Sequence, residues 1–187
     1  SDVCSSDLQA YAQSGSGVFY LRNSSGEVTF QGNCVPQANG LRQMDFSPVK
    51  AEGWYTLEVD GKKSRPFRIG RDAYIPAAWK TLNFFFSERC GFDVPGIHTE
   101  CHMDVMSVHP DGRRLPVCGG WHDAGDLTQA AINTAESVFA MLELAIAERE
   151  AQPELSQRAK EEARWGLNWL MRTRWGDGYR HNGTVIG

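Results

Sequence analysis

Apolar and polar residues alternate with the period of β-strands between Gly17 and about Ile69. The segments that alternate in this way are Val18–Arg22, Glu27–Gln31, Trp54–Val59 and Arg65–Ile69. Asn23–Gly26 and Asp60–Gly61 separate them with residues that favour hairpin turns. The pattern predicts a small β-sandwich over residues 9–70, about two strands short of an immunoglobulin-like domain.

The period changes to that of amphipathic helices near Arg71. Three helices are predicted: Pro76–Arg89 with proline at its first position, Leu127 to about Arg149, and about Leu155 to Arg172. Strands therefore come first and helices second, which predicts two domains with a boundary near residue 70. The second domain, residues 71–187, is expected to be all-α.

Residues 91–125, between the first two predicted helices, follow neither period and are rich in Gly, Pro, His and Asp. A segment of this length without regular structure is uncommon in a compact domain and is usually functional. Candidate chemistry is therefore expected there.

The net charge and the two ends of the chain limit which partners are expected and which residues are treated as native. The net charge of −4 gives no indication of nucleic acid or an anionic membrane as partner, and no apolar run approaches the about 20 residues that span a bilayer. No feature specifies an oligomeric state. Ser1–Leu8 fits no periodicity and resembles translated adapter sequence, so these residues are treated as non-native. Asn182–Gly187 stops where a further element is expected to begin, which predicts that the chain is part of a longer protein.

Two carboxylates, Asp123 and Asp126, stand three residues apart in the stretch Gly119-Gly-Trp-His-Asp-Ala-Gly-Asp126. Hydrolysis of a glycosidic bond requires one carboxyl to protonate the leaving oxygen and a second, ionised one to act opposite it. A helix beginning at Leu127 would favour the ionised form of Asp126 through its unpaired N–H groups. The same residues also fit a helix start alone, with Asp126 as N-cap and Gln129 reaching back in a capping box. The residues by themselves leave both interpretations open.

Four sulfur and imidazole side chains lie in or beside the irregular segment: Cys90, Cys101, His102 and His122. Four such ligands with no bound water form a closed, structural zinc site. A zinc ion there would attach the first helix to the loop that carries the two aspartates. The alternative is a Cys90–Cys101 disulfide, or free buried thiols, with unrelated histidines. Cys34 and Cys118 have no evident partner and are predicted to be small buried residues.

The aromatic residues of the predicted helices are expected to lie in the core. Trp121 differs because it lies inside the glycine-rich turn. It is therefore the candidate for a ring face that stacks on a sugar.

Together these motifs resemble family 9 of the glycoside hydrolases, the cellulase family of inverting β-1,4-glucanases. The segments that carry the resemblance are Met44–Ser47, Gly53–Val59, Phe84–Gly91, Cys101-His102, Gly119–Asp126, Trp165–Leu170 and Gly176–Gly178. The resemblance implies an incomplete immunoglobulin-like β-sandwich followed by the first three helices of an (α/α)6 barrel.

The resemblance also implies roles for individual residues. Asp126 corresponds to the catalytic base, and Asp123 to the residue that positions the attacking water. Cys90, Cys101, His102 and His122 correspond to the ligands of a structural Zn²⁺, and no catalytic cofactor is implied. The general acid is a glutamate expected beyond residue 187, so the chain itself is expected to be inactive. Leu127 replaces the usual aromatic residue, and Cys118 stands where Ser or Thr is common.

The expected function is that of a secreted or periplasmic endo-acting hydrolase whose partner is a β-linked polysaccharide or oligosaccharide, with β-1,4-glucan as substrate. One alternative is a relative acting on xyloglucan, mixed-linkage glucan or a glucosamine oligosaccharide. A second alternative is a non-catalytic carbohydrate-binding or scaffold protein with the same fold. A third, a zinc hydrolase, requires an open position on the metal.

Overall fold

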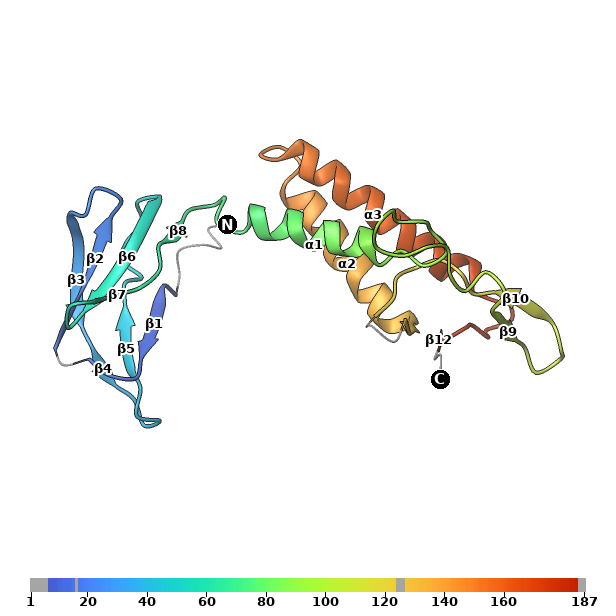
Figure 1. The fold of residues 1–187 in the computed structure, drawn as a ribbon, viewed down its shortest axis with the longest axis horizontal. Helices are drawn as coiled ribbons and strands as arrows, with labels where there is room; N and C mark the ends of the chain where they lie inside the picture. Colours follow the sequence, from blue (N-terminus) through green and yellow to red (C-terminus); the bar gives the residue numbers. More distant parts are fainter. Residues whose placement is uncertain (1–6, 16, 124–126, 185–187) are drawn as a thin grey trace. The chain divides into compact units, whose positions relative to one another are not determined.

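The structure is a computed structural model that describes residues 7–15, 17–123 and 127–184. The chain divides into two compact units, residues 1–76 and 77–187. Strands make up the first unit and helices dominate the second, in the order that the sequence predicts (Figure 1).

The described residues of unit 1 form two antiparallel sheets. Its strands are β1 (Gln9–Ala12), β2 (Val18–Asn23), β3 (Val28–Asn33), β4 (Val35–Pro36), β5 (Arg42–Asp45), β6 (Gly53–Val59), β7 (Lys62–Lys63) and β8 (Phe67–Ile69). One sheet has the strand order β1-β5-β4, and the other has the order β3-β2-β6-β7 with β8 also paired to β6.

The alternation of side chains explains which face of each strand is buried. Phe19 and Leu21 of β2, and Tyr55 and Leu57 of β6, enter one core, whereas Trp54 of β6 is exposed. Residues from other strands and loops complete that core: Cys34, Met44, Phe46 and Ile69. The predicted hairpin between β2 and β3 is confirmed by the register of the two strands.

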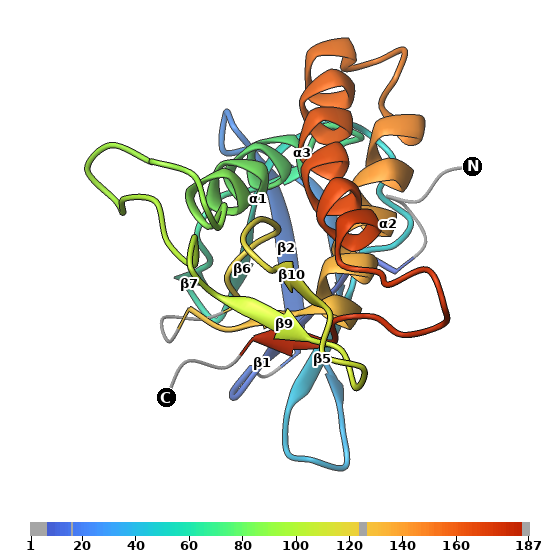
Figure 2. The same cartoon turned by 90° about the vertical axis from the view of Figure 1, so that its right-hand side faces the viewer.

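The described part of unit 2 holds two complete helices, all but the first two residues of a third, and several short strands. The helices are α1 (Ile75–Ser87), α2 (Ala131–Ala147) and α3 (Pro153–Arg172). The strands are β9 (Met106–Val108), β10 (Arg114–Pro116), β11 (Gln129–Ala130) and β12 (Gly183–Thr184). In both ribbon views α2 and α3 lie side by side (Figures 1 and 2).

Small residues allow α2 and α3 to approach closely. Ala159 and Ala163 lie on the buried stripe of α3, and Ala145 lies on that of α2. Ser156 Oγ also donates a hydrogen bond to Ala145 O at 2.7 Å. Pro153 begins α3 because its fixed φ suits the first turn of a helix.

The structure corrects the predicted start of the second helix. That helix begins at Ala131 rather than Leu127, because Gln129–Ala130 pairs with Gly183–Thr184 as a short strand. Leu127 itself has a φ of 59°, outside the helical region. The capping box from Asp126 to Gln129, and the helix N-terminus that would favour ionised Asp126, are therefore wrong.

The segment predicted to be irregular contains the antiparallel pair β9–β10. Among the described residues no helix combines the length and the apolar character needed to cross a membrane.

Candidate active-site stretch and metal centre

A short antiparallel bridge joins the segment after α1 to the glycine-rich stretch. Arg89 and Trp121 are paired across it, and the N–H groups of Cys90 and His122 donate to opposing carbonyls at 3.0 and 2.9 Å. Successive side chains of extended chain point to opposite sides. The bridge therefore separates Cys90 and His122 from Arg89 and Trp121, and each side has its own role.

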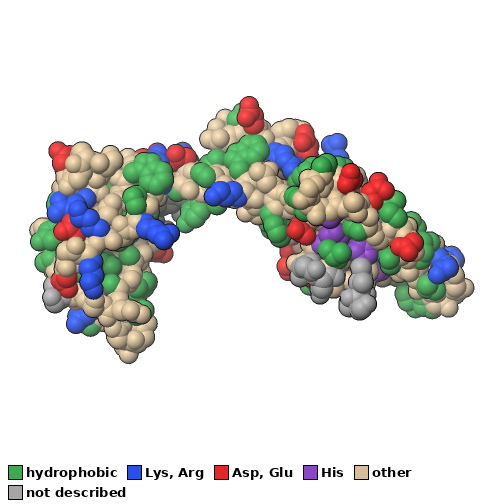
Figure 3. Space-filling model, in the orientation of Figure 1, with side chains coloured by type: hydrophobic (Ala, Val, Ile, Leu, Met, Phe, Trp, Pro, Cys, Tyr) green, Lys and Arg blue, Asp and Glu red, His purple; other side chains and the backbone are tan. Residues whose placement is uncertain are grey.

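On one side, four ligand-type side chains converge. These four, called the Cys/His cluster, are Cys90, Cys101, His102 and His122, and their ligand atoms all lie within 4.8 Å of one another. Cys90 Sγ is 3.2 Å from His102 Nδ1, and Cys101 Sγ is 3.2 Å from His122 Nε2. Histidine side chains also gather at one place in the space-filling view (Figure 3).

The spacing of these donor atoms fits a tetrahedral zinc ion. Zinc bond lengths place two sulfur ligands about 3.8 Å apart and a sulfur and a nitrogen ligand about 3.6 Å apart. The two sulfurs of Cys90 and Cys101 are 3.9 Å apart, and the two sulfur–nitrogen pairs, at 3.2 Å, are about 0.4 Å closer than in a zinc site. Two thiolates and two imidazoles are also a donor set that zinc prefers. The residues present therefore fit a structural Zn²⁺.

The disulfide alternative is wrong for this structure. Cys90 and Cys101 are free thiols, and their separation of 3.9 Å is nearly twice the about 2.05 Å of a disulfide bond. His98 does not join the cluster, because its ring nitrogens lie 2.8 and 2.9 Å from the carbonyl oxygens of Ser87 and Thr99.

Burial sets the protonation states in the cluster. It raises the pKa of the Cys90 thiol to about 12, and it lowers the pKa of His122 to about 4, with His102 and His98 adding to that second effect. Burial also lowers the pKa of His102. The imidazoles are therefore neutral at pH 7, the form that binds metal, whereas a buried thiol requires a neighbouring cation to lose its proton.

The backbone at His102 is strained. Its φ of 56° lies in the left-handed region, which costs a residue with a Cβ about 1–3 kcal/mol. Such strain persists where the surroundings determine the conformation, and functional sites collect it. At His102 this conformation accompanies a side chain that faces Cys90 Sγ.

On the other side of the bridge, Glu162 of α3 is fully buried. Arg89 donates two hydrogen bonds to its carboxylate, at 3.0 and 2.9 Å, and Arg158 donates a third at 2.7 Å. Trp121 Nε1 donates a fourth at 2.8 Å. The Arg89 guanidinium also lies 4.6 Å from the centre of the Trp165 ring. Removal of one partner from a buried pair of this kind costs about 3–5 kcal/mol, so the network fixes the bridge against α3.

The glycine pair of the stretch is required by close approach to α3. Gly119 and Gly120 have φ values of 106° and 67°, and a Cβ on Gly120 would lie 2.9 Å from the Trp169 ring. Side chains of α3 and its C-terminal turn then hydrogen-bond the carbonyls of the stretch. The donors are Trp165 to Gly120 O (2.7 Å), Trp169 to Val117 O (2.8 Å) and Arg172 to Cys118 O (2.6 Å).

The structure corrects the assignment of Trp121 as a sugar-stacking ring. Its side chain is 4% exposed, and the ring occupies the space above Gly166, where a Cβ would lie 2.3 Å from its carbons. Phe85 packs against it edge-on, with ring centres 5.0 Å apart. Trp121 is therefore a core residue, held there by its contacts with α3 and α1.

Asp123 lies at the exposed end of this fixed stretch. Its N–H donates to Thr128 O at 2.8 Å, and Asn133 Nδ2 in the first turn of α2 donates to its Oδ2 at 3.2 Å. The carboxylate is thus both exposed and held. Asp126, the predicted base, lies outside the described residues.

The remaining cysteines follow the prediction in part. Cys34 is buried in the core of unit 1, whereas Cys118 is half-buried beside Gly91.

A second group of ligand-type side chains lies near the β9–β10 hairpin. It consists of His109, Asp111 and Asp177, together with Arg113, and is called the ion cluster. Arg113 Nε donates to Asp111 at 2.7 Å, and Arg113 Nη2 donates to Asp177. The ring of His109 packs against Trp175 and Tyr179, with ring centres 5.1 and 4.7 Å away.

Sequence reasoning missed three residues of this region: Glu162, Gln129 and Asn133. Glu162 carried a signal, because it is the one acidic residue on the buried face of α3, next to Ala159 and Ala163. Gln129, whose side chain donates to Gly119 O, and Asn133 depend on contacts that no local pattern shows.

Comparisons with known proteins agree on one family. Residues 74–187 match the sequence profile described as Glycosyl hydrolase family 9. Endoglucanase C of Cellulomonas fimi is 29% identical over 197 aligned positions, which cover 81% of this chain and 18% of that protein.

Solved structures give the same result. The structure of AaCel9A in complex with cellobiose-like isofagomine superposes with a TM-score of 0.71 and 27% identity, over 96% of this chain and 38% of that one. A Zn-binding triple mutant of the GH family 9 endoglucanase J30 superposes with a TM-score of 0.69 and 27% identity, over 96% and 40%. The chain thus spans less than a fifth of that endoglucanase and about two fifths of these structures.

Proposed function

The chain belongs to glycosyl hydrolase family 9, and on that basis we propose that the complete protein hydrolyses β-1,4-linked glucan chains by single displacement, with inversion. The membership also confirms the predicted fold class. The β region is immunoglobulin-like, and the three helices are the start of an (α/α)6 barrel.

The observation that carries the proposal is the held and exposed carboxylate of Asp123. Asn133 donates a hydrogen bond to its Oδ2. The backbone before it is attached to α3 through the carbonyls of Val117, Cys118 and Gly120. A carboxylate that is exposed for solvent yet fixed in direction can hold a water molecule for attack. We assign this role to Asp123.

We assign the role of general base to Asp126, which takes the proton of that water as it attacks the anomeric carbon. An inverting enzyme also needs a general acid that protonates the leaving oxygen from the opposite side. We place that acid in the part of the complete protein after residue 187. Activity is therefore a property of the complete protein and not of these 187 residues.

We further propose that the Cys/His cluster holds one Zn²⁺. Cys90, Cys101, His102 and His122 would supply all four ligands, so the ion has a structural role and leaves no position for a reacting water. His122 immediately precedes Asp123, and the zinc site would thus fix the backbone at the carboxylate.

The substrate of the proposal is a polymer too large to cross a membrane. We therefore place the complete protein outside the cytoplasm, in a secreted or periplasmic form.

The test is sugar release by the complete enzyme from a panel of soluble β-glucans, with Asp126→Asn alongside and Asp93→Asn as a matched control at another exposed site. We expect wild type and the control to release sugar, with the α-anomer formed first. We expect Asp126→Asn to lower kcat about 10³-fold and to retain substrate binding and fold.

Two results would contradict the proposal in different ways. A near-normal rate for Asp126→Asn would remove that residue from the base role. Binding without release by wild type, on every glucan tested, would favour a non-catalytic carbohydrate-binding protein.

A further inference from the structure

The β unit presents one tryptophan to solvent from β6, an interior strand of its larger sheet. Trp54 on β6 is 56% exposed, although its neighbours Tyr55 and Leu57 on the same strand are buried. An indole combines a flat apolar ring with an N–H donor, so an exposed tryptophan can pack on the apolar face of a ligand and hydrogen-bond its rim. Trp54 takes no part in the core of the unit.

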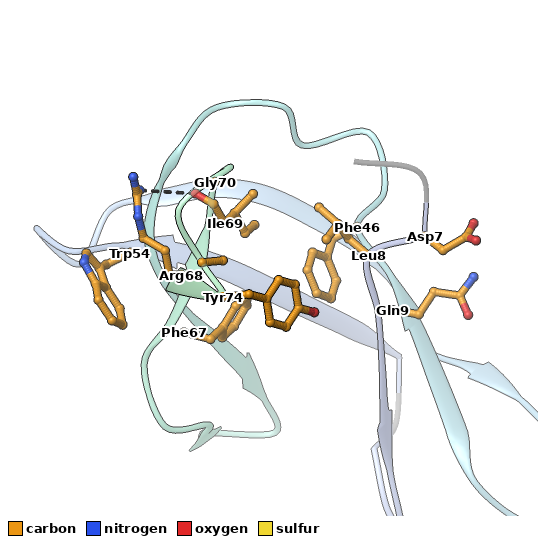
Figure 4. A pocket seen from close by; sticks show the side chains of 11 residues that line it. Asp7, Leu8, Gln9, Phe46, Trp54, Phe67, Arg68, Ile69, Gly70 and Tyr74 are labelled. Carbon is orange, nitrogen blue, oxygen red and sulfur yellow. Dashed lines mark hydrogen bonds between the residues drawn. The ribbon is translucent and has the colours of Figure 1, made fainter. Parts of the chain in front are cut away.

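Two hollows of unit 1 meet at this ring. The smaller, about 350 Å³, is lined by Trp54 together with side chains that can hydrogen-bond: Arg22, Asn23, Ser24, Thr56 and Lys63. The larger, about 750 Å³, has Trp54 at one end beside Arg68 (Figure 4). Both volumes fall in the about 300–1,000 Å³ range of small-molecule sites.

Only the smaller hollow carries the argument. Asp7 and Leu8 line the larger one, and they belong to the segment that its sequence marks as non-native.

Charges around the ring are already neutralised within the unit. Arg22 Nε lies 2.6 Å from Glu58, and Lys63 lies 3.9 Å from the same carboxylate. Arg68 is paired with Asp72 at 3.0 Å and with Glu52 at 3.6 Å, so these three cations face three carboxylates. The surface therefore offers fixed hydrogen-bonding groups without a strong net charge, which fits a neutral ligand better than an anionic one.

A β-linked glucan has these properties, because each sugar presents an apolar C–H face and a rim of hydroxyl groups. The indole ring matches the face, and the paired polar side chains of the hollow match the hydroxyls. We propose that Trp54 and the smaller hollow form a second glucan-binding site, on the β unit, separate from the hydrolytic site. The sugar class rests on the proposed function, whereas the place of the site rests on unit 1 alone.

The experiment uses the complete enzyme with Asp126→Asn, so that glucan is not consumed. Native gels containing soluble β-glucan measure retention, and a titration with cellohexaose is followed by ¹⁹F NMR of fluorotryptophan. We expect Trp54→Ala to weaken binding of the polymer about tenfold, and Trp54→Phe to retain part of it. The ¹⁹F signal that disappears in Trp54→Phe should shift when the sugar is added.

Tyr11→Ala is the matched control, because Tyr11 is a similarly exposed aromatic residue, at 54%, on β1 of the other sheet. We expect it to bind as wild type. Equal retention of Trp54→Ala and wild type, or equal weakening by Tyr11→Ala, would overturn the proposal. An unmoved Trp54 signal at saturating sugar would do the same, including where Trp54→Ala proves unstable.

Failure of this site and failure of the proposed hydrolysis are separate results. Sugar release by wild type with an unmoved Trp54 signal would support the proposed hydrolysis and exclude the second binding site. A shifted Trp54 signal without sugar release by wild type would support the second binding site and exclude the proposed hydrolysis.

Discussion

The Cys/His cluster and the ion cluster both contain ligand-type side chains of the long segment after α1, which Asp177 from beyond α3 joins in the ion cluster. The two clusters differ in the source of their positive charge. In the ion cluster Arg113 contacts both carboxylates, so the chain supplies its own cation. In the Cys/His cluster sulfur and imidazole groups face one another at 3.2 and 3.9 Å. The charged side chain described beside them, Glu88 at 3.8 Å from His122 Nδ1, is an anion and supplies no positive charge.

The difference shows how to judge a group of potential metal ligands. Convergent donor atoms indicate a metal only where no side chain of the protein already neutralises them. The buried set satisfies this condition and also has a spacing that suits zinc, whereas the ion cluster is a surface salt-bridge network with a histidine attached.

The largest expected effect follows from removal of a ligand of the buried set. His122→Ala should lose its equivalent of zinc and lower Tm by on the order of 10 °C, because several kcal/mol of metal binding are folding free energy. Elemental analysis and calorimetry of the complete protein measure the two quantities. His98→Ala is the control, since His98 lies beside His122 without facing the donors. One retained equivalent of metal with an unchanged Tm would exclude His122 as a ligand.

A smaller effect should come from removing the cation of the ion cluster. Arg113→Met leaves His109, Asp111 and Asp177 without their cation, so added Mn²⁺ should raise the Tm of the variant by about 2 °C and leave wild type unchanged. Arg114→Met, an exposed neighbour, serves as control. If Mn²⁺ raised the Tm of wild type by the same amount, Arg113 would not be the group that takes the place of a metal ion in the ion cluster.

The smallest effect concerns pH. The N–H of Arg113, followed by His109 and the Arg113 side chain, lowers the pKa of Asp111 from 3.8 to about 2. The stabilisation is therefore fully present above pH 3.8 and is lost as the pH falls toward 2. Asp111→Asn should make the acid limb of the unfolding free energy shallower in that window. Urea unfolding between pH 2 and 5 measures this slope, with Asp93→Asn as control; identical slopes for Asp111→Asn and wild type would count against the assigned contacts.

The sequence predicted the elements whose signals are local. Alternation identified β2 and β6, because every second residue of each strand is a large apolar residue that enters the core. Helical spacing of apolar residues, together with Pro153 at the start, identified α3. The order of strands and helices gave the fold class. The spacing of Cys90, Cys101, His102 and His122 led to the group that the structure brings together.

The errors arise where a distant segment decides. Gln129–Ala130 has the composition of a helix start, but pairing with Gly183–Thr184 makes it a strand. Trp121 lies in a turn and was expected at the surface, but Glu162 and Gly166, more than forty residues later, bury it. No pattern within a short window carries either contact.

The fit of the Trp121 ring over Gly166 has a consequence for protein engineering and for evolution. A residue larger than glycine at position 166 would meet the ring, and a smaller residue at position 121 would leave a void and remove one of the two hydrogen bonds to Glu162 Oε1. The residue tolerated at position 121 therefore depends on the residue at position 166, and the reverse also holds. A library that randomises either position alone samples mostly misfolded variants, whereas one that varies both together can reach alternatives that single steps cannot.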